Sequence, residues 1–192
     1  MGSNPTSRPR LNFLNPWKLL DSRVPYENRW IRLREDSVLR PDGRPGIYGV
    51  IELRPSVAIV ALNERKEIVL VGQWRYPTDR YSWEVPRGGS NEGESDLLGA
   101  ARRELLEETG VEADDWTELG DLDLCNGVLR AEERLYLATS LRRGASRPDP
   151  EESIETRWVP LEEAVGMVMR NEIREATSAA AILRVALMLS HS

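Results

Sequence analysis

The chain has 192 residues, 40% of them hydrophobic, which is enough for one domain with its own core and a small appendage. Lys and Arg number 26 against 32 Asp and Glu, a net charge of −6, so the broad basic surface that a nucleic-acid-binding protein needs is missing. The only cysteine, Cys125, excludes an internal disulfide or a cysteine-rich zinc site, and the only histidine, His191, stands next to the C-terminus, which leaves acid–base chemistry to carboxylates.

The sequence contains neither a signal peptide nor an apolar run of the ~18 residues that a membrane span needs. We therefore expect a cytoplasmic protein that binds neither membranes nor nucleic acid. Residues 1–14 are expected to form a flexible N-terminus, native or in part left over from expression. Cys125 is expected to be a small buried side chain.

Two hairpins are predicted first along the chain. Between Asn28 and Ile51 the apolar residues alternate around the sequence PDGRPG, whose Asp-Gly step and two prolines predict a turn between two strands. The β-branched runs 57–63 and 67–74 are joined by the polar sequence ERK and predict a second hairpin of well-buried strands. The sheet is therefore expected to be mixed or antiparallel.

A helix is predicted after the Pro- and Gly-rich sequence EVPRGGSNEGES. It runs from Asp96 to Thr109, with Ser95 as its N-cap and Gly110 in the left-handed conformation that ends many helices. The rest of the chain predicts three short strands and two helices, and the last helix, with the apolar run AAAILRVALML, is expected in the core or at a dimer contact. The strands are 116–124, 134–139 and 155–159, and the helices are 161–170 and 178–190.

Glu104, Glu107 and Glu108 lie on one face of the first predicted helix, within an arc of about 100°. Like charges three and four residues apart repel, so a helix selected for stability alone would intersperse lysines. Three convergent carboxylates offer the oxygen ligands that hard divalent cations prefer, and a solvated acidic face is the alternative. Gly88 and Gly89 in the preceding loop favour a site, because glycine lets the backbone approach a ligand such as a phosphate closely.

The loop and helix resemble the Nudix box, in which Gly, five residues, Glu and seven residues precede Arg-Glu-apolar-any-Glu-Glu-any-Gly-apolar. The second half is complete from Arg103 to Val111. The first half departs from this pattern by one residue. If Gly88 and Glu94 are taken as its Gly and Glu, the gap between them is correct, but eight residues and not seven separate Glu94 from Arg103. If Gly89 is taken as the Gly, the spacing to Arg103 is correct, but Ser95 stands where Glu belongs. One extra residue in the loop or in the first helical turn would reconcile the two halves.

The resemblance covers nearly the whole chain from about Asn15. The N-terminal NPWKLLDSRVPYENRWIRLREDSVLRPDG, then WRYP, SWEVPRGG, the box and RWVPLEEAV look like the Nudix branch that hydrolyses ADP-ribose and other nucleoside diphosphate sugars. Membership implies an α/β/α sandwich around a mixed β-sheet, cleavage of a nucleoside diphosphate linked to another moiety, and dependence on Mg²⁺ or Mn²⁺. It divides the chain into an N-terminal antiparallel β-hairpin segment, 15–54, which in this branch often swaps between the subunits of a homodimer, and a Nudix hydrolase domain, 55–192.

The resemblance also assigns roles to the residues of the box. Glu104, Glu107 and Glu108 would hold the metal, with Glu107 central to catalysis. The box arginine orients the glutamates in this family, and Arg103 lies four residues before Glu107, within helical pairing reach. An ordinary surface ion pair is the alternative for Arg103.

Two further carboxylate roles are expected outside the box. Glu84, in SWEVP, would lie near the metal or substrate, unless it occupies the solvated side of an edge strand. In related enzymes the general base is often a glutamate on a loop after the box, and here PDPEESIE places Glu152 there, with Glu151 and Glu155 as the other candidates. A solvated run of charges is the alternative for all three.

Besides Glu84, Gly88 and Gly89, four further residues are candidates for substrate binding. Arg75 and Arg80, in QWRYPTDRY, would flank the mouth of the cleft and bind the terminal phosphate or ribose bidentately. Tyr26 and Trp30 would stack on the base, with core packing as the alternative. The small-molecule partner expected from the resemblance is a nucleotide sugar.

The sequence leaves alternatives for the function. The proline-containing loop that ADP-ribose-specific members carry beyond the box is replaced here by DLCNGVLRAEE, so a GDP- or UDP-hexose stays open as the substrate. A Nudix activity on coenzyme A, dinucleoside polyphosphates or oxidised nucleotides is a second alternative. The third is a catalytically silent Nudix domain that senses a nucleotide, although such domains are expected to lose a box glutamate, and the second half of this box keeps all of them.

Overall fold

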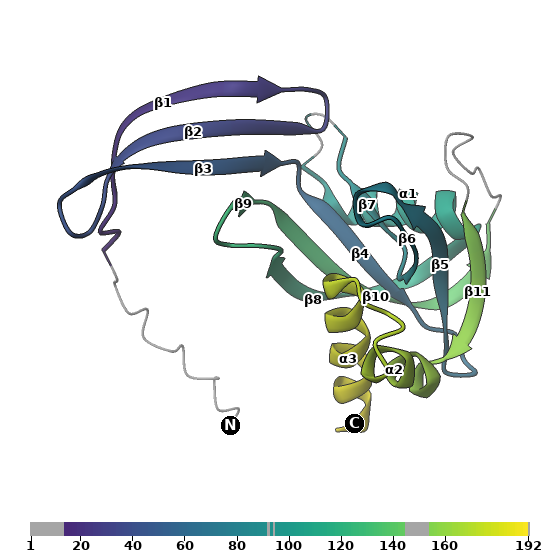
Figure 1. The fold of residues 1–192 in the computed structure, drawn as a ribbon. Helices are drawn as coiled ribbons and strands as arrows, with labels where there is room; N and C mark the ends of the chain where they lie inside the picture. The colour runs from purple at the N-terminus through teal and green to yellow at the C-terminus, as the bar shows by residue number, and fades with distance from the viewer. Residues whose placement is uncertain (1–13, 92, 94, 145–153, 192) are drawn as a thin grey trace, which may run out of the picture.

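The computed structural model describes residues 14–91, 93, 95–144 and 154–191 (Figure 1). Residues 1–13 of the predicted flexible terminus 1–14, Glu94 and the loop that holds Glu151 and Glu152 lie outside these residues. The strands are β1 (Lys18–Glu27), β2 (Ile31–Leu39), β3 (Pro45–Leu53), β4 (Ser56–Ala61), β5 (Glu67–Arg75), β6 (Arg80–Glu84), β7 (Arg87–Gly89), β8 (Val111–Asp123), β9 (Leu129–Arg130), β10 (Glu132–Arg143) and β11 (Glu155–Pro160). The helices are α1 (Leu97–Thr109), α2 (Leu161–Met169) and α3 (Ala176–Ser190), with a 3₁₀ turn at Tyr76–Thr78.

The N-terminal segment forms a four-stranded sheet, in the order β1-β2-β3-β9, that projects from the body as an arm (Figure 1). The predicted hairpin is present: β2 and β3 pair antiparallel from Ile31 opposite Leu53 to Leu39 opposite Pro45. Its turn contains Gly43 at a φ of 80°, where glycine avoids the strain of a side chain. The sequence did not predict β1, which pairs antiparallel with β2 and is exposed along its whole length.

The second predicted hairpin is wrong in its pairing. β4 lies between β7 and β10 in one sheet, β5 lies between β11 and β6 in another, and a single bridge between Leu62 and Ile68 joins the two strands. Both strands are buried over most of their length, and each therefore takes two neighbours of its own. The first sheet, in the order β7-β4-β10-β8, is mixed, since β10 runs parallel to β4 and antiparallel to β8.

Alternation along β4 explains the layers of the fold. Val57, Ile59 and Ala61 contribute to one apolar cluster with Ala101 and Leu105 of α1. The intervening residues of β4 contribute to a second cluster with buried side chains of α2 and α3, including Ala164, Met167, Ala181, Ile182 and Val185. Helices therefore cover both faces of a mixed sheet, which confirms the predicted α/β/α class and places the C-terminal apolar helix in the core (Figure 1).

The helix predicted at 96–109 is α1, with a corrected N-cap. Asp96, rather than Ser95, is the capping residue, and its side chain accepts a hydrogen bond from the Gly99 amide at 3.0 Å. Gly110 ends the helix at a φ of 68° as predicted, and its amide donates to the Leu106 carbonyl at 2.9 Å. These caps fix which residues of α1 lie within the helix.

Cys125 is exposed, contrary to prediction, because it lies in the turn between β8 and β9. Among the described residues, no helix combines the length and the apolar character needed to cross a bilayer.

Candidate active site

The acidic face of α1 lies against β7, the strand formed by the glycine-rich sequence. The Glu108 carboxylate accepts a hydrogen bond from the Arg87 amide at 3.0 Å. A Cβ atom added at Gly88 would overlap the Glu104 carboxylate, so only glycine permits this approach. Gly89 has open space around the same position. The box and the glycine strand therefore meet at Gly88, and the approach of this backbone to a phosphate stays a prediction.

Arg103 lies between the like charges of the acidic helix. Its NH1 nitrogen donates to Glu104 at 2.8 Å and to Glu107 at 3.0 Å, and its NH2 nitrogen donates to the Gly89 carbonyl at 3.0 Å. Partial burial lowers the pKa of Arg103, but Glu104 and Glu107 outweigh this effect and hold the pKa above its usual value. Arg103 thus links two box carboxylates to the glycine strand, a more constrained arrangement than an isolated surface ion pair.

The box residues fit a divalent cation by their chemistry. Three carboxylates on one helical face are oxygen donors of the type that hard cations prefer. Within residues 14–91, 93, 95–144 and 154–191, no three His, Cys, Asp or Glu side chains are arranged to hold an ion as they stand, and Arg103 joins two of the carboxylates. The donor types and the close approach at Gly88 support Glu104, Glu107 and Glu108 as the residues that would hold a cation.

Glu84 is 1% exposed, so the alternative of a solvated edge-strand side chain is wrong. It accepts two hydrogen bonds from Arg75, from Nε at 2.9 Å and from NH2 at 2.6 Å. This bidentate pair joins β5 to β6 and orients the guanidinium of Arg75, a predicted substrate ligand. Glu84 therefore acts first as the buried partner of Arg75.

A second buried carboxylate, Glu133 of β10, was not predicted. It is fully buried, receives hydrogen bonds from Arg87 at 3.0 and 2.7 Å, and accepts another from the Thr177 hydroxyl at 2.5 Å. Arg87 also lies 3.2 Å from Glu175, the N-cap of α3. Because the backbone amide of Arg87 binds Glu108, this network connects the acidic face of α1 to α3 and β10. Its members lie far apart in sequence, and no local pattern could have brought them together.

A cavity of about 420 Å³ adjoins this network, and we call it the arginine pocket. Four arginines and two carboxylates line it: Arg75, Arg80, Arg87, Arg174, Glu84 and Glu175. The structure thus brings the two predicted substrate arginines, Arg75 and Arg80, to one cavity. Arg174, between α2 and α3, was missed because it lies 94 positions beyond Arg80 in the sequence.

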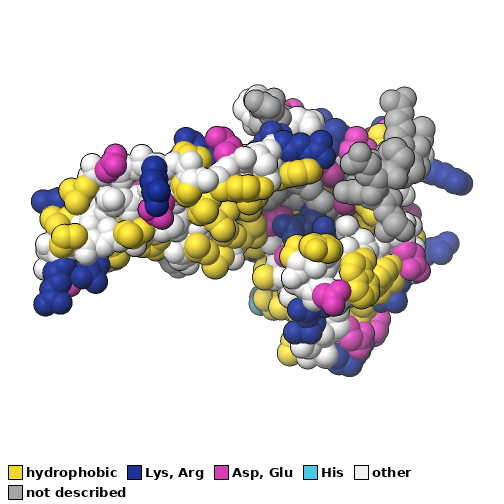
Figure 2. Space-filling view, turned by 45° about the horizontal axis from the view of Figure 1, so that its top comes forward, with side chains coloured by type: hydrophobic (Ala, Val, Ile, Leu, Met, Phe, Trp, Pro, Cys, Tyr) yellow, Lys and Arg dark blue, Asp and Glu magenta, His cyan; other side chains and the backbone are white. Residues whose placement is uncertain are grey.

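The predicted base-stacking residues lie elsewhere, on the arm. Trp30 is 63% exposed and Tyr26 is 52% exposed, so the alternative of core packing is wrong for both. The Arg29 guanidinium lies 3.9 Å from the centre of the Trp30 ring, where cation and ring attract each other. Figure 2 shows hydrophobic side chains gathered along this arm. Within this chain the two aromatic side chains do not line the arginine pocket.

Of the three candidates for the general base, the structure describes only Glu155. Glu152, the predicted base, and Glu151 lie outside the described residues. Glu155 is the first residue of β11, and its carboxylate accepts a hydrogen bond from the Tyr81 hydroxyl at 2.9 Å. Tyr81 and Glu84 are three positions apart on β6 and therefore point to opposite faces of the sheet. Glu155 thus lies on the face opposite Glu84.

Comparison with known proteins decides the family. Residues 52–182 match the model of the NUDIX domain, and residues 17–51 match that of the nucleoside diphosphate sugar hydrolase N-terminal domain. The chain is a Nudix hydrolase.

Relatives of this Nudix hydrolase span most of its length. It is 39% identical over 173 residues to an ADP-ribose pyrophosphatase of Mycobacterium tuberculosis, covering 88% of this chain and 83% of that protein. It is 28% identical over 166 residues to the CMP-5'-(N-acetyl-N-hydroxy-3-aminopropyl)phosphonate hydrolase of Streptomyces rubellomurinus, covering 86% of this chain and 79% of that one. The structure of an ADP compounds hydrolase superposes with a TM-score of 0.83 at 22% identity, over 93% of this chain and 97% of that one, and this likeness shows the shared fold.

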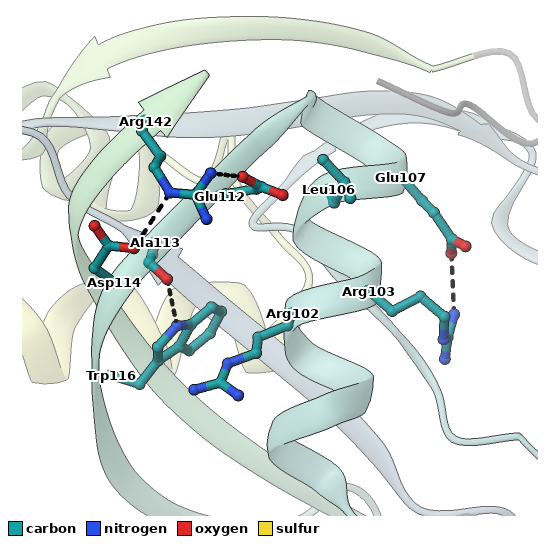
Figure 3. Close-up of a pocket in the computed structure, with 9 residues that line it drawn as sticks. All are labelled: Arg102, Arg103, Leu106, Glu107, Glu112, Ala113, Asp114, Trp116 and Arg142. Carbon is teal, nitrogen blue, oxygen red and sulfur yellow. Dashed lines mark hydrogen bonds and ion pairs between the residues drawn. The ribbon is translucent and has the colours of Figure 1, made fainter. Parts of the chain in front are cut away.

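Helix α1, which carries the Nudix box, also borders a cleft of about 770 Å³, larger than the arginine pocket and drawn in Figure 3. Arg102 and Trp116 lie on one side of α1 in this view, and Arg103 with Glu107 lies on the other (Figure 3). Arg142 of β10 pairs with Glu112 and Asp114 of the neighbouring strand β8 on one side of the cleft, so the charges of the cleft are largely balanced. The cleft is therefore less suited to an anion than the arginine pocket.

Proposed function

We propose that this Nudix enzyme hydrolyses nucleoside diphosphate sugars such as ADP-ribose, yielding a nucleoside monophosphate and a sugar phosphate, with Mg²⁺ or Mn²⁺ as the cofactor. The observation that carries the proposal is the contact of Glu104 and Glu108 with the glycine strand, with Glu107 paired to Arg103 beside them, next to a pocket of four arginines. The N-terminal match to nucleoside diphosphate sugar hydrolases and the likeness to an ADP-ribose pyrophosphatase support the substrate class.

The reaction adds the oxygen of water to one phosphorus atom of the pyrophosphate and breaks the bond from that phosphorus to the bridging oxygen, which leaves on the other phosphate. When bound, a divalent cation screens the charge that builds on these oxygens and lowers the pKa of the attacking water. Glu104, Glu107 and Glu108 hold the cation in this proposal, and Arg103 keeps Glu104 and Glu107 in position. Glu152 remains the candidate to accept the proton of the water.

The nucleotide end of the substrate is assigned to the arm. Trp30 and Tyr26 offer exposed aromatic faces, and stacking accepts any base, so these residues supply affinity with little selectivity among bases. Because they do not line the arginine pocket of their own chain, the proposal includes a homodimer in which the arm of one subunit completes the site of the other. A cytoplasmic location remains a prediction of the sequence.

Phosphorus NMR of the products tests the function directly. ADP-ribose, GDP-mannose, UDP-glucose and a dinucleoside polyphosphate are each incubated with the protein, with Mg²⁺, with Mn²⁺ and with chelator. We expect metal-dependent formation of two phosphomonoesters from at least one of the three nucleotide sugars, because cleavage of the bridge produces one on each side.

The panel also separates the alternatives. If only the dinucleoside polyphosphate were hydrolysed, the protein would still act as a Nudix hydrolase, but its substrate class would not be the nucleoside diphosphate sugars. No turnover of any compound with either metal would contradict the proposal, and the sensor alternative would then be tested by nucleotide binding without cleavage.

A further inference from the structure

The arginine pocket carries more positive charge than its own carboxylates balance. Four guanidinium groups line it, but only two carboxylates do, those of Glu84 and Glu175. The hydroxyl-bearing side chains of Thr78 and Ser82 also line it and offer neutral donors. Its lining is therefore polar and net cationic, which favours an anionic occupant.

Two of the four arginines are fixed by buried acids. Arg75 makes its bidentate pair with Glu84, which is 1% exposed, and Arg87 makes its pair with the fully buried Glu133. Buried charges of this kind need partners, so these contacts satisfy Glu84 and Glu133 and hold two walls of the pocket in place. The guanidinium groups of Arg75 and Arg87 are thus held in position by protein carboxylates.

The other two arginines have a different environment. In the part of the chain that the structure describes, the guanidinium groups of Arg80 and Arg174 make neither a hydrogen bond nor an ion pair. They come from separate elements, Arg80 from the start of β6 and Arg174 from the segment between α2 and α3. Two cations from unrelated parts of the fold therefore meet at one cavity of about 420 Å³ without an ion-pair partner among the described residues.

We propose that the arginine pocket binds a phosphomonoester group, with Arg80 and Arg174 as its charged ligands. Two cations match the charge of a phosphomonoester, roughly −1.5 to −2 at neutral pH, better than the single charge on each phosphate of the intact diester. Guanidinium groups bind phosphate oxygens through paired hydrogen bonds. The backbone of Arg87 connects the pocket to Glu108, so the site adjoins the box and would receive a phosphate freed by cleavage.

The inference rests on the proposed function for the source of that phosphate, which is the sugar phosphate, the nucleoside monophosphate or inorganic phosphate. All three share the chemistry that the pocket recognises. A binding measurement without metal distinguishes them and does not depend on turnover.

Isothermal titration calorimetry with chelator present is the test, using inorganic phosphate, ribose 5-phosphate and AMP in separate titrations. The variants are Arg80→Gln and Arg174→Gln. The control is Arg65→Gln, since Arg65 is an exposed arginine in the turn between β4 and β5, outside the pocket. Thermal melting of each variant checks the fold, and within the described residues neither Arg80 nor Arg174 makes a hydrogen bond or ion pair that the substitution would remove.

We expect at least one of the three compounds to bind the wild type, and each pocket variant to weaken that binding about tenfold, the usual effect of one lost charged hydrogen bond. Arg65→Gln should bind like the wild type. The compound that binds tightest identifies the source of the phosphate. No binding of any compound to the wild type, or equal affinity in all variants, would overturn the inference.

The proposed function and the proposed phosphomonoester site can be contradicted independently of each other. Metal-dependent cleavage without binding of these three compounds would leave the proposed function in place and remove the pocket assignment. Binding that depends on Arg80 and Arg174, without cleavage of any nucleotide sugar, would do the reverse.

Discussion

Gly88 and Gly89 are adjacent glycines with different requirements, and they offer a matched test of the site. A Cβ atom at Gly88 would overlap the Glu104 carboxylate, whereas one at Gly89 would meet nothing within 4 Å. We expect Gly88→Ala to displace Glu104 and lower kcat on the order of ten- to a hundredfold, the usual effect of disturbing a group that positions a metal ligand. Gly89→Ala should stay near wild type.

Steady-state kinetics at saturating Mg²⁺, with a thermal melt of both variants, makes the comparison. Equal kcat in the two variants would show that the close approach at Gly88 does not matter for the site. A fall in both melting temperatures without a difference in kcat would assign the glycines to the fold alone.

Glu107 is the box carboxylate whose role can be tested with the smallest change in shape. Glu107→Gln keeps the size of the side chain and removes a ligand charge, so the fold should persist while kcat falls on the order of a hundredfold or more. Glu112→Gln is the control, because Glu112, the second residue of β8, pairs among the described residues with Arg142 and not with Arg103 or another box residue (Figure 3). Near-wild-type rates of Glu107→Gln at saturating Mg²⁺ would refute the assignment of Glu107 as a ligand of the metal.

At this scale the sequence predicted the residues that a local pattern can specify. The spacing of the second half of the box placed Arg103 within reach of Glu107, and the ion pair is present. Glu133 and Arg174 were not foreseen, since Glu133 meets an arginine 46 positions away and no motif marks either residue. The general base and the one-residue departure at Glu94 remain predictions, as they lie outside the described residues.

Among the elements, α3 depends on a carboxylate at its N-terminus. Glu175 accepts hydrogen bonds from the amides of Thr177 and Ser178 at 3.1 and 2.7 Å, and lies beside Arg87. Burial raises the pKa of Glu175, but Arg87 and the hydrogen bonds from Ser178 and Thr177 outweigh burial and hold the pKa below its usual value. The charged form is therefore the one that stabilises the folded protein.

The pH dependence of stability follows from that direction. A carboxyl group whose pKa is lowered by folding stabilises the protein above its unfolded pKa, about 4.3, and this contribution is lost as the pH falls through the lower folded value. We expect wild type to exceed Glu175→Gln in free energy of unfolding at pH 7, and the difference to shrink below about pH 4. Urea unfolding of both proteins at each pH measures it, and a difference that does not change with pH would contradict the prediction.

The elements show where local sequence stops specifying structure. The ends of α1 were predicted to within about a residue because the helix caps act locally: Gly110 was identified, and the N-cap moved by one position to Asp96. The partners of β4 and β5 were not, because burial of a strand on both faces is visible in its sequence but the identity of its neighbours is not. The strand β1 was missed because its residues do not alternate between buried and exposed positions, all ten being exposed.

For the whole molecule, the arm presents an exposed apolar face on which a partner could pack. Tyr26, Leu33 and Ile51 lie opposite one another on β1, β2 and β3 and so share one face of the sheet, and Ile47 lies on the same face of β3. Ile47 is 72% exposed and Tyr26 is 52% exposed. An apolar sheet face left open to solvent favours association, and a second copy of the chain is the partner expected from the resemblance.

The dimer can be tested by placing a charge on that face. We expect the wild type to sediment at twice the 21.8 kDa of one chain, and Ile47→Glu to sediment as a monomer because a buried unpaired charge is costly. Met169→Glu is the matched control, since Met169 at the end of α2 is 74% exposed but lies away from the arm. If the arm also completes the site of its partner, Ile47→Glu should raise KM several-fold while the monomer stays folded. A wild-type monomer with full activity would refute both the dimer and the assignment of Trp30 to a shared site.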